Sequence, residues 1–97
     1  MDTHSIAYYA GFFDGEGYVG NGFRGRMEVR IVNTYRPILD EICSKYGGHV
    51  YERKKSNTRH RTAYELAIVG QEDVERFLSD IYPHLREKKK RVDALSR

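Results

Sequence analysis

The sequence predicts an α+β fold in the order αββαββα, with one four-stranded antiparallel sheet. Apolar residues recur at helical spacing in three segments, and in the segments between them they alternate with polar residues. Glycine-containing turns divide the alternating segments into two hairpins, which can pair into one sheet. The helices would cover one face of this sheet, and the other face, rich in Arg, His and Tyr, would stay open.

Length and composition bound the domain organisation and the compartment. The 97 residues suffice for a single domain, residues 1–97, with a modest core. With no run of about 18 apolar residues and no basic-then-apolar leader, we expect a soluble intracellular protein that does not enter a membrane. Cys43 is the single cysteine, which excludes an internal disulfide and a cysteine-rich zinc site, and we interpret it as a core residue.

The first helix is expected to begin at Thr3 or Ser5, either of which can cap it. It is apolar on every side, which predicts burial on more than one side. Gly11 and Gly15 lie four residues apart on one helix face, although glycine destabilises a helix by about 1 kcal/mol relative to alanine. That face would admit a second helix at close range, or it would pack on the chain's own sheet.

Two carboxylates, Asp14 and Glu16, emerge where we expect the helix to break at Gly15 and Gly17. The helix dipole disfavours negative charge at a C-terminus, and a bound cation would relieve that conflict. The alternative interpretation is that both acids are solvated turn residues.

The first hairpin is expected over residues 17–32, with its second strand at 26–32. Its turn falls at Asn21-Gly22 or, as we prefer, at Arg24-Gly25, which would give a longer first strand. A second helix follows Asn33-Thr34 and ends at Gly47-Gly48.

The second hairpin begins at His49 and has a polar tip over residues 54–60. Its returning strand is expected to bury Tyr64, Leu66 and Ile68, and to turn outward Arg61, Ala63, Glu65 and Ala67. A third helix is expected over residues 71–81, ended by Pro83, and the basic run 88–91 follows.

Basic residues concentrate in the middle of the chain. No Lys or Arg precedes Arg24, whereas residues 24–61 hold ten basic and four acidic residues, a net charge of +6. Such a surface suits nucleic acid, although a solvated charged face is the plainer interpretation. Antiparallel strands can enter the major groove of DNA, where Arg reads guanine. The residues expected to contact DNA are Tyr18, Arg24, Arg26, Glu28, Arg30, His49, Tyr51, Arg53, Lys55, Arg61 and Glu65. Within this set, Glu28 and Glu65 either accept from cytosine or pair with a neighbouring Arg.

The segment Tyr9–Gly17, Tyr-Ala-Gly-Phe-Phe-Asp-Gly-Glu-Gly, resembles the signature of the LAGLIDADG homing endonucleases. Tyr9 replaces the usual leucine, and Glu16 stands where aspartate is common. Val29–Leu39 and Phe77–Leu85 are also similar to the family, so the resemblance extends over nearly the whole chain. It implies the αββαββα fold with an open, concave DNA-binding face. Because there is one motif, it also implies a homodimer whose signature helices cross at the two-fold axis, with Gly11, Asp14 and Gly15 at the dimer interface.

The same resemblance implies the residues of a catalytic site. Glu16, with backbone help from Gly15, would hold Mg²⁺, for which Mn²⁺ would substitute, while Ca²⁺ would support binding without cleavage. Asp14 would orient the helix end rather than bind metal. Lys88 would be the active-site base or electrostatic helper, with Lys89 and Lys90 as close alternatives, or else a cationic flank that contacts backbone phosphate. Asn33 and Arg36 would lie near the scissile phosphate, unless they only cap a helix.

The sequence therefore predicts a homodimeric, Mg²⁺-dependent hydrolase, a site-specific endonuclease for intron homing. Its partner would be a long, nearly palindromic double-stranded DNA site, with no small-molecule substrate. The alternative is a non-catalytic nucleic-acid-binding protein of the same fold, such as an intron-splicing maturase or a DNA binder. A structural or protein-interaction module would leave the open basic face and Glu16 unexplained.

Overall fold

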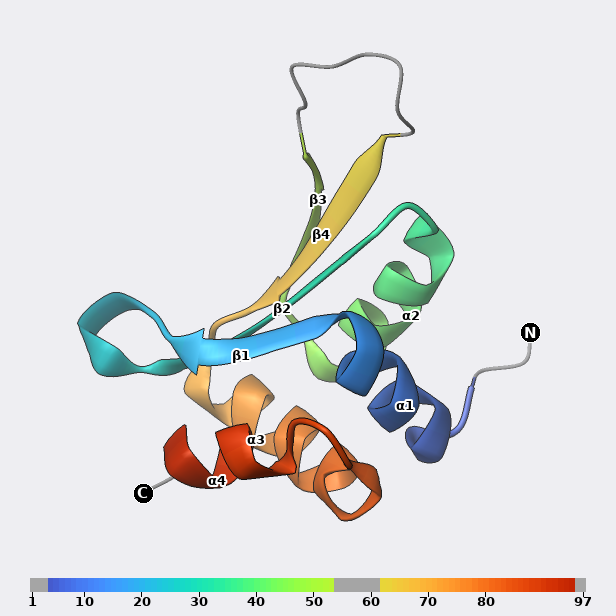
Figure 1. Ribbon diagram of the computed structural model, residues 1–97. Coiled ribbons are helices and arrows are strands. Elements are labelled where there is room, and N and C mark those ends of the chain that lie inside the picture. The colour runs from blue at the N-terminus through green and yellow to red at the C-terminus, as the bar shows by residue number, and fades with distance from the viewer. Residues whose placement is uncertain (1–3, 54–61, 96–97) are drawn as a thin grey trace.

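Helices cover one face of a four-stranded antiparallel sheet in the computed structural model, which describes residues 4–53 and 62–95 (Figure 1). The elements in chain order are α1 (Ile6–Glu16), β1 (Gly17–Asn21), the 3₁₀ turn η1 (Phe23–Gly25), β2 (Met27–Asn33), α2 (Arg36–Tyr46), β3 (His49–Arg53), β4 (Ala63–Ile68), α3 (Gln71–Ile81), the 3₁₀ turn η2 (Tyr82–His84) and α4 (Lys89–Leu95). The predicted α+β class and element order are confirmed, and a short helix, α4, follows the predicted elements. No helix in the described ranges is long and apolar enough to cross a membrane.

The sheet has the strand order β1-β2-β4-β3, so the two hairpins meet along β2 and β4. Val29 of β2 pairs with Val19 of β1 and Ile68 of β4, and Ile31 pairs with Leu66. These side chains are buried under the helices and form the centre of the core. Cys43 of α2 packs against this core, as predicted, and burial raises the pKa of its thiol.

The first hairpin reverses direction between the two predicted turn signals. Arg24 and Gly25 adopt left-handed backbone conformations with φ of 59° and 74°. The preferred turn position therefore does form part of the turn. The Gly22 amide donates to the Arg26 carbonyl at 2.6 Å and closes the loop. The first strand is nevertheless not lengthened, and the second strand begins and ends one residue later than predicted.

Strand β4 is more buried than its pattern indicated. Ala63, Glu65 and Ala67 do alternate with the core residues, as their predicted outward direction requires, but each is at most 9% exposed. The reason is that β4 is a central strand, flanked on both sides by longer side chains of β2 and β3. The predicted tip at 54–60 and the predicted DNA contacts Lys55 and Arg61 lie outside the described residues.

Helix α1 buries only one side in the single chain. Ser5 caps it, with its Oγ accepting from the Tyr8 amide at 3.1 Å. Tyr9, Ala10 and Phe13 are fully buried, whereas Tyr8 on the opposite side is 46% exposed. One copy of the chain therefore buries one side of α1, and burial of a second side stays a prediction.

The sequence predicts that the helix breaks at Gly15 and Gly17. It continues through Gly15 to Glu16, and it ends at Gly17, which is already the first residue of β1. The Phe13 ring packs directly over Gly17, where an added Cβ would lie 2.1 Å from a ring carbon. Gly17 is thus required by packing rather than by an unusual backbone angle, because its φ of −91° is open to any residue.

Replacing Gly17 by alanine is expected to destabilise the fold, because the new methyl group collides with the Phe13 ring. Overpacking of this kind typically costs about 1–3 kcal/mol. The free energy of unfolding from urea titration measures it. Gly17→Ala in a Phe13→Leu background is the matched control and should cost much less, and equal costs in both backgrounds would exclude this contact as the cause.

Candidate active site and nucleic-acid interface

The end of α1 and the end of β2 meet at one edge of the sheet. Gly17 pairs with Ile31, so Asn33, two residues further along β2, lies beside Glu16. The Asn33 side-chain amide donates to Glu16 Oε1 at 3.2 Å, while its own Oδ1 accepts from the Tyr35 amide at 2.8 Å. Asn33 therefore supports the turn into α2 and at the same time contacts an exposed carboxylate.

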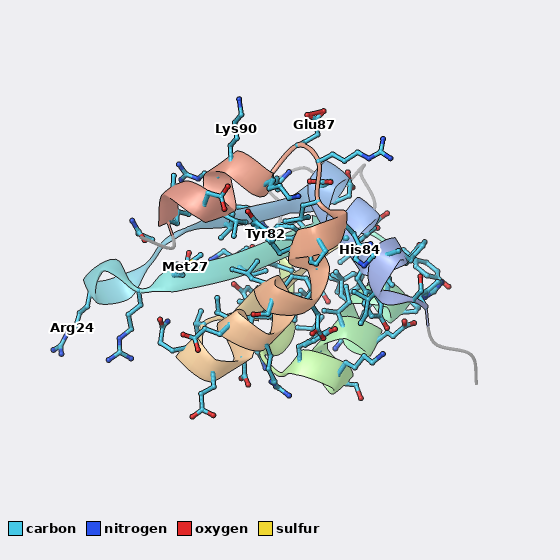
Figure 2. The ribbon with its side chains drawn as sticks, turned by 90° about the horizontal axis from the view of Figure 1, so that it is seen from below. Arg24, Met27, Tyr82, His84, Glu87 and Lys90 are labelled. Atoms are coloured by element: carbon cyan, nitrogen blue, oxygen red, sulfur yellow. The ribbon has the colours of Figure 1, made fainter. Side chains whose placement is uncertain are left out.

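Lys88 reaches the same end of α1 from a distant part of the chain. The Asp14 carboxylate accepts hydrogen bonds from the backbone amides of Arg86 at 2.7 Å and Lys88 at 2.9 Å. Lys88 Nζ in turn donates to the Asp14 backbone carbonyl at 2.7 Å. Lys89 instead lies over the Tyr82 ring, 5.0 Å from its centroid, and Lys90 projects away from the body of the molecule (Figure 2).

Arg36 does not join this group. Its Nε donates to Asp40 within the first turns of α2 at 3.4 Å, and its guanidinium lies 5.3 Å from the centroid of the Tyr64 ring. The structure thus brings Glu16, Asn33 and Lys88 to the C-terminal end of α1 and leaves Arg36 on the adjoining helix.

The oxygen donors at this edge fit an open metal site rather than a closed one. Within residues 4–53 and 62–95, no three His, Cys, Asp or Glu side chains come together. Glu16 offers one exposed carboxylate, and both Asp14 oxygens already accept backbone hydrogen bonds. Mg²⁺ commonly takes one or two protein carboxylates and completes its shell with water and phosphate oxygens, so a single Glu16 is compatible with it.

The open face of the sheet is organised around Arg30. Its guanidinium contacts Glu28 at 2.9 Å, Glu65 at 2.5 Å and the Tyr51 hydroxyl at 2.9 Å. Tyr51 also donates to Glu65 at 2.6 Å, and Arg53 lies 3.7 Å from the other Glu65 oxygen. Of the two interpretations of Glu28 and Glu65, the structure has the one in which they pair with arginine.

Glu65 is the most buried charged group of this face, only 7% exposed. Burial pushes the pKa of its carboxyl upward, but hydrogen bonds from Tyr51 and Arg30 and the nearby arginine charges outweigh burial and leave the pKa below its ordinary value. The hydrogen bonds to Glu28 and then Glu65 raise the pKa of Arg30. The face is therefore less positive at its centre than the charge count implied.

Other predicted contact residues surround this centre. Tyr18 pairs with Arg30 across the sheet and is 48% exposed. His49 stacks on Tyr51, with ring centroids 5.7 Å apart. Arg24 extends from the tip of the β1–β2 hairpin (Figure 2), and Arg26 follows it in the same loop. Tyr18, two residues after Glu16, lies between this polar, aromatic face and the edge where Glu16 lies.

The outer side of α1 is open. An added Cβ at Gly11 or Gly15 would meet no atom of the described chain within 4 Å, so neither glycine packs on the chain's own sheet. A hollow of about 450 Å³ lies beside Gly11, bounded by Ala7, Asp14 and residues 83–86.

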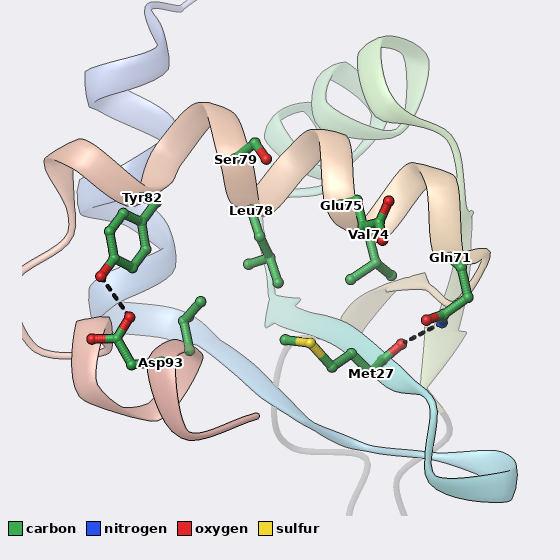
Figure 3. Close-up of a pocket in the computed structure, with 9 residues that line it drawn as sticks. Met27, Gln71, Val74, Glu75, Leu78, Ser79, Tyr82 and Asp93 are labelled. Carbon is green, nitrogen blue, oxygen red and sulfur yellow. Dashed lines mark hydrogen bonds between the residues drawn. The ribbon is translucent and has the colours of Figure 1, made fainter. Parts of the chain in front are cut away.

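A second hollow, of about 440 Å³, lies on the helical side of the sheet between β2, α3 and α4 (Figure 3). Gln71 donates to the Met27 carbonyl at 3.3 Å at one end, and the Tyr82 hydroxyl donates to Asp93 at 2.5 Å at the other. Its remaining lining is largely the apolar side chains Val74, Leu78 and Val92, so it is separate from the polar face.

Sequence reasoning missed two contacts of the site. Asp14 binds backbone amides that lie 72 and 74 residues further along the chain, which no local pattern encodes. Arg91 of α4 donates to the Val19 carbonyl of β1 at 3.2 Å and holds α4 against the first strand. The basic run at 88–91 signalled positive charge at this position, but not these partners.

Comparison with known proteins places the fold in a family. The family model of the LAGLIDADG-like domain matches residues 4–82, and the chain therefore belongs to that family. No curated protein matches the sequence.

Solved structures of homing endonucleases share the fold, as three of them illustrate. The homing endonuclease I-CvuI, in complex with its target in the presence of calcium, aligns with a TM-score of 0.72 at 23% identity, covering 94% of this chain and 63% of that one. The archaeal intron-encoded homing endonuclease I-Vdi141I, complexed with DNA, gives 0.70 at 20% identity, covering 93% and 63%. The group I intron-encoded I-CeuI, complexed with DNA, gives 0.69 at 18% identity, covering 98% and 56%. This chain thus spans less than two thirds of each relative.

The Glu65 carboxylate is expected to make folding stability depend on pH. Because its pKa is lowered in the folded state, its contribution is present above the unfolded pKa of about 4.3 and is lost as the pH falls through the folded pKa. The free energy of unfolding should therefore decrease as the pH is lowered into the acid range. For Glu65→Gln it should decrease less steeply. Urea titrations between neutral and acid pH measure it, with Glu75→Gln, exposed on α3, as the control. Parallel profiles for wild type and Glu65→Gln would contradict this prediction.

Proposed function

We propose that this protein is a site-specific DNA endonuclease that acts as a homodimer and uses a divalent metal held at Glu16. The observation that carries the proposal is the direct passage from α1 into β1 at Glu16 and Gly17. An exposed carboxylate that suits a metal is thereby fixed to the edge of an open polar sheet face that suits DNA. Antiparallel strands with Arg, His and Tyr side chains are able to enter the major groove.

The residues at the end of α1 have complementary chemical roles in this proposal. Mg²⁺, or Mn²⁺ in its place, would supply an activated water and neutralise charge on the phosphate. Glu16, helped by the Gly15 backbone, would hold that ion, and Asn33 orients the Glu16 carboxylate through its hydrogen bond. Lys88 would place a positive charge near the phosphate, where it favours the negative charge that develops in the transition state. Ca²⁺ would support binding without cleavage.

The homodimer follows from stoichiometry and from the open side of α1. Cutting both DNA strands needs two sites, and each chain offers one exposed carboxylate at the end of its signature helix. Gly11 and Gly15 leave the backbone of α1 accessible, and Tyr8 on the same outer side is half exposed. A second copy of α1 crossing here would bury this surface and bring two Glu16 side chains near the two-fold axis.

A selection on randomised duplex DNA tests the nuclease directly. The protein is incubated with the library and Mg²⁺, and the cut ends are sequenced. We expect cuts within one long, nearly palindromic site. A protein that selects a site tightly in Ca²⁺ but never cuts with Mg²⁺ or Mn²⁺ would instead be a non-catalytic binder of the same fold.

On the selected site, Glu16→Gln is expected to abolish cleavage and to leave specific binding nearly intact. Glutamine keeps the size and one carbonyl oxygen of Glu16 but loses the charge that holds Mg²⁺. Gel assays with Mg²⁺ for cleavage and Ca²⁺ for binding measure both, with Glu52→Gln on β3 as a control that should cut normally. Cleavage by Glu16→Gln at the wild-type rate would show that the active-site assignment is wrong.

Gly11→Leu is expected to weaken the homodimer, because the side chain would wedge the two α1 backbones apart. Overpacking costs about 1–3 kcal/mol, which corresponds to a roughly 5- to 150-fold weaker association. Sedimentation at micromolar concentration, with and without DNA, measures it. Ser44→Leu, exposed on α2, is the control and should not change the association. A monomeric wild type under both conditions would refute the homodimer.

A further inference from the structure

The connection between η2 and α4 is held at two points although residues 85–88 form no helix or strand of their own. Leu85 is buried in the core, 4% exposed, and its amide donates to the Tyr82 carbonyl at 3.1 Å. One residue later the chain meets Asp14, whose Oδ2 accepts from the Arg86 amide and whose Oδ1 accepts from the Lys88 amide. A single side chain of α1 therefore fixes the path of a segment that is distant in sequence.

Asp14 binds both the backbone amide and the side-chain ammonium of Lys88. Its backbone amide binds the Asp14 carboxylate, and its Nζ donates to the Asp14 carbonyl at 2.7 Å. The same Nζ lies 5.9 Å from the centroid of the Phe13 ring, so the side chain runs along the end of α1. Its carbonyl then accepts from the Val92 amide at 3.0 Å, which begins α4.

The electrostatics of the helix end agree with this arrangement. The C-terminal carbonyls of a helix carry partial negative charge, which disfavours Asp14 and favours the Lys88 ammonium. The Asp14 carboxylate accepts hydrogen bonds from two backbone N–H groups, and these compensate its negative charge. Since both of its oxygens already accept a backbone hydrogen bond, Asp14 has less capacity left to hold a metal than the exposed Glu16 carboxylate has.

We propose that Asp14 is a positioning residue that holds the Lys88 ammonium at the C-terminal end of α1, the helix that carries Glu16, and that it affects cleavage only through Lys88. This inference rests on the proposed nuclease function for its catalytic part. A purely structural anchor would weaken folding, binding and cleavage together. A metal ligand would slow cleavage whether or not Lys88 is present.

Asp14→Asn is the sharpest variant, because asparagine keeps the shape but presents an NH₂ group to one of the two backbone donors. We expect the single-turnover cleavage rate constant to fall about 100-fold, the scale of losing one positioned catalytic group, with affinity in Ca²⁺ little changed. The rate constant of Lys88→Ala should fall by a similar factor. The double variant should cut no more slowly than Lys88→Ala. Asp93→Asn, which removes the charge of the carboxylate that accepts from Tyr82 but keeps one acceptor oxygen, is the matched control and should cut at the wild-type rate. Losses that multiply in the double variant would overturn the proposal.

A second readout does not depend on cleavage. In the folded protein, NMR should show protected amides at Arg86 and Lys88, together with ring-current shifts of the Lys88 side-chain methylenes near Phe13. Asp14→Asn should lose both signatures, whereas Glu16→Gln should keep them.

If the wild type never cuts DNA, the proposed function fails, but these signals still decide whether Asp14 positions Lys88. Unchanged signals in Asp14→Asn would overturn the proposal. Should Asp14→Asn not fold, Asp14→Glu, which keeps the charge and both oxygens but lengthens the side chain, is expected to shift the same Lys88 signals, and unshifted signals would overturn the proposal.

Discussion

The contact between the Phe13 ring and Gly17 is the constraint on which the arrangement of this molecule depends. No residue lies between α1 and β1, and this contact forms across their junction, so the direction of the helix and the start of the sheet are set together. From this junction follow the position of Glu16 at the sheet edge and the pairing that brings Asn33 beside it. The helix is also fixed in rotation, because the side that carries Phe13 must face the core.

An aromatic cluster continues this constraint through the helical layer. Phe13 meets Phe77 of α3 edge-on, Phe77 meets Tyr46 of α2, and Tyr46 meets Tyr9 of α1. The two tyrosines keep their hydroxyl groups hydrogen-bonded at the margin of the core, Tyr9 to Glu41 at 2.5 Å and Tyr46 to Asp80 at 2.8 Å. Burial and the bond to Asp80 raise the pKa of Tyr46 to about 12. The apolar rings thus pack three helices together while every polar tip of this cluster has a partner.

The sequence predicted what depends on local periodicity. The class, the element order and the bounds of α3 at Gln71–Ile81 all rest on patterns within one segment, and the structure agrees with them. What it did not predict depends on partners far along the chain. The exposure of Glu65 is decided by the strands on both sides of β4, and the hydrogen bonds of Asp14 are made by the amides of residues 86 and 88. The catalytic and DNA-contacting roles stay predictions, although the structure brings Glu16, Asn33 and Lys88 together and gathers the strand residues on one face.

The hydrogen-bonded group around Arg30 has a consequence for molecular discrimination. Its guanidinium is already engaged by Glu28, Glu65 and Tyr51. Any ligand that contacts it must therefore compete with these partners or fit the donors that remain directed outward. Drawing Arg30 away removes the closest positive charge from the nearly buried Glu65 carboxylate, which is unfavourable. A surface built in this way rejects an approximate fit more severely than one of freely rotating, unpaired arginines, because an imperfect ligand breaks existing contacts without replacing them.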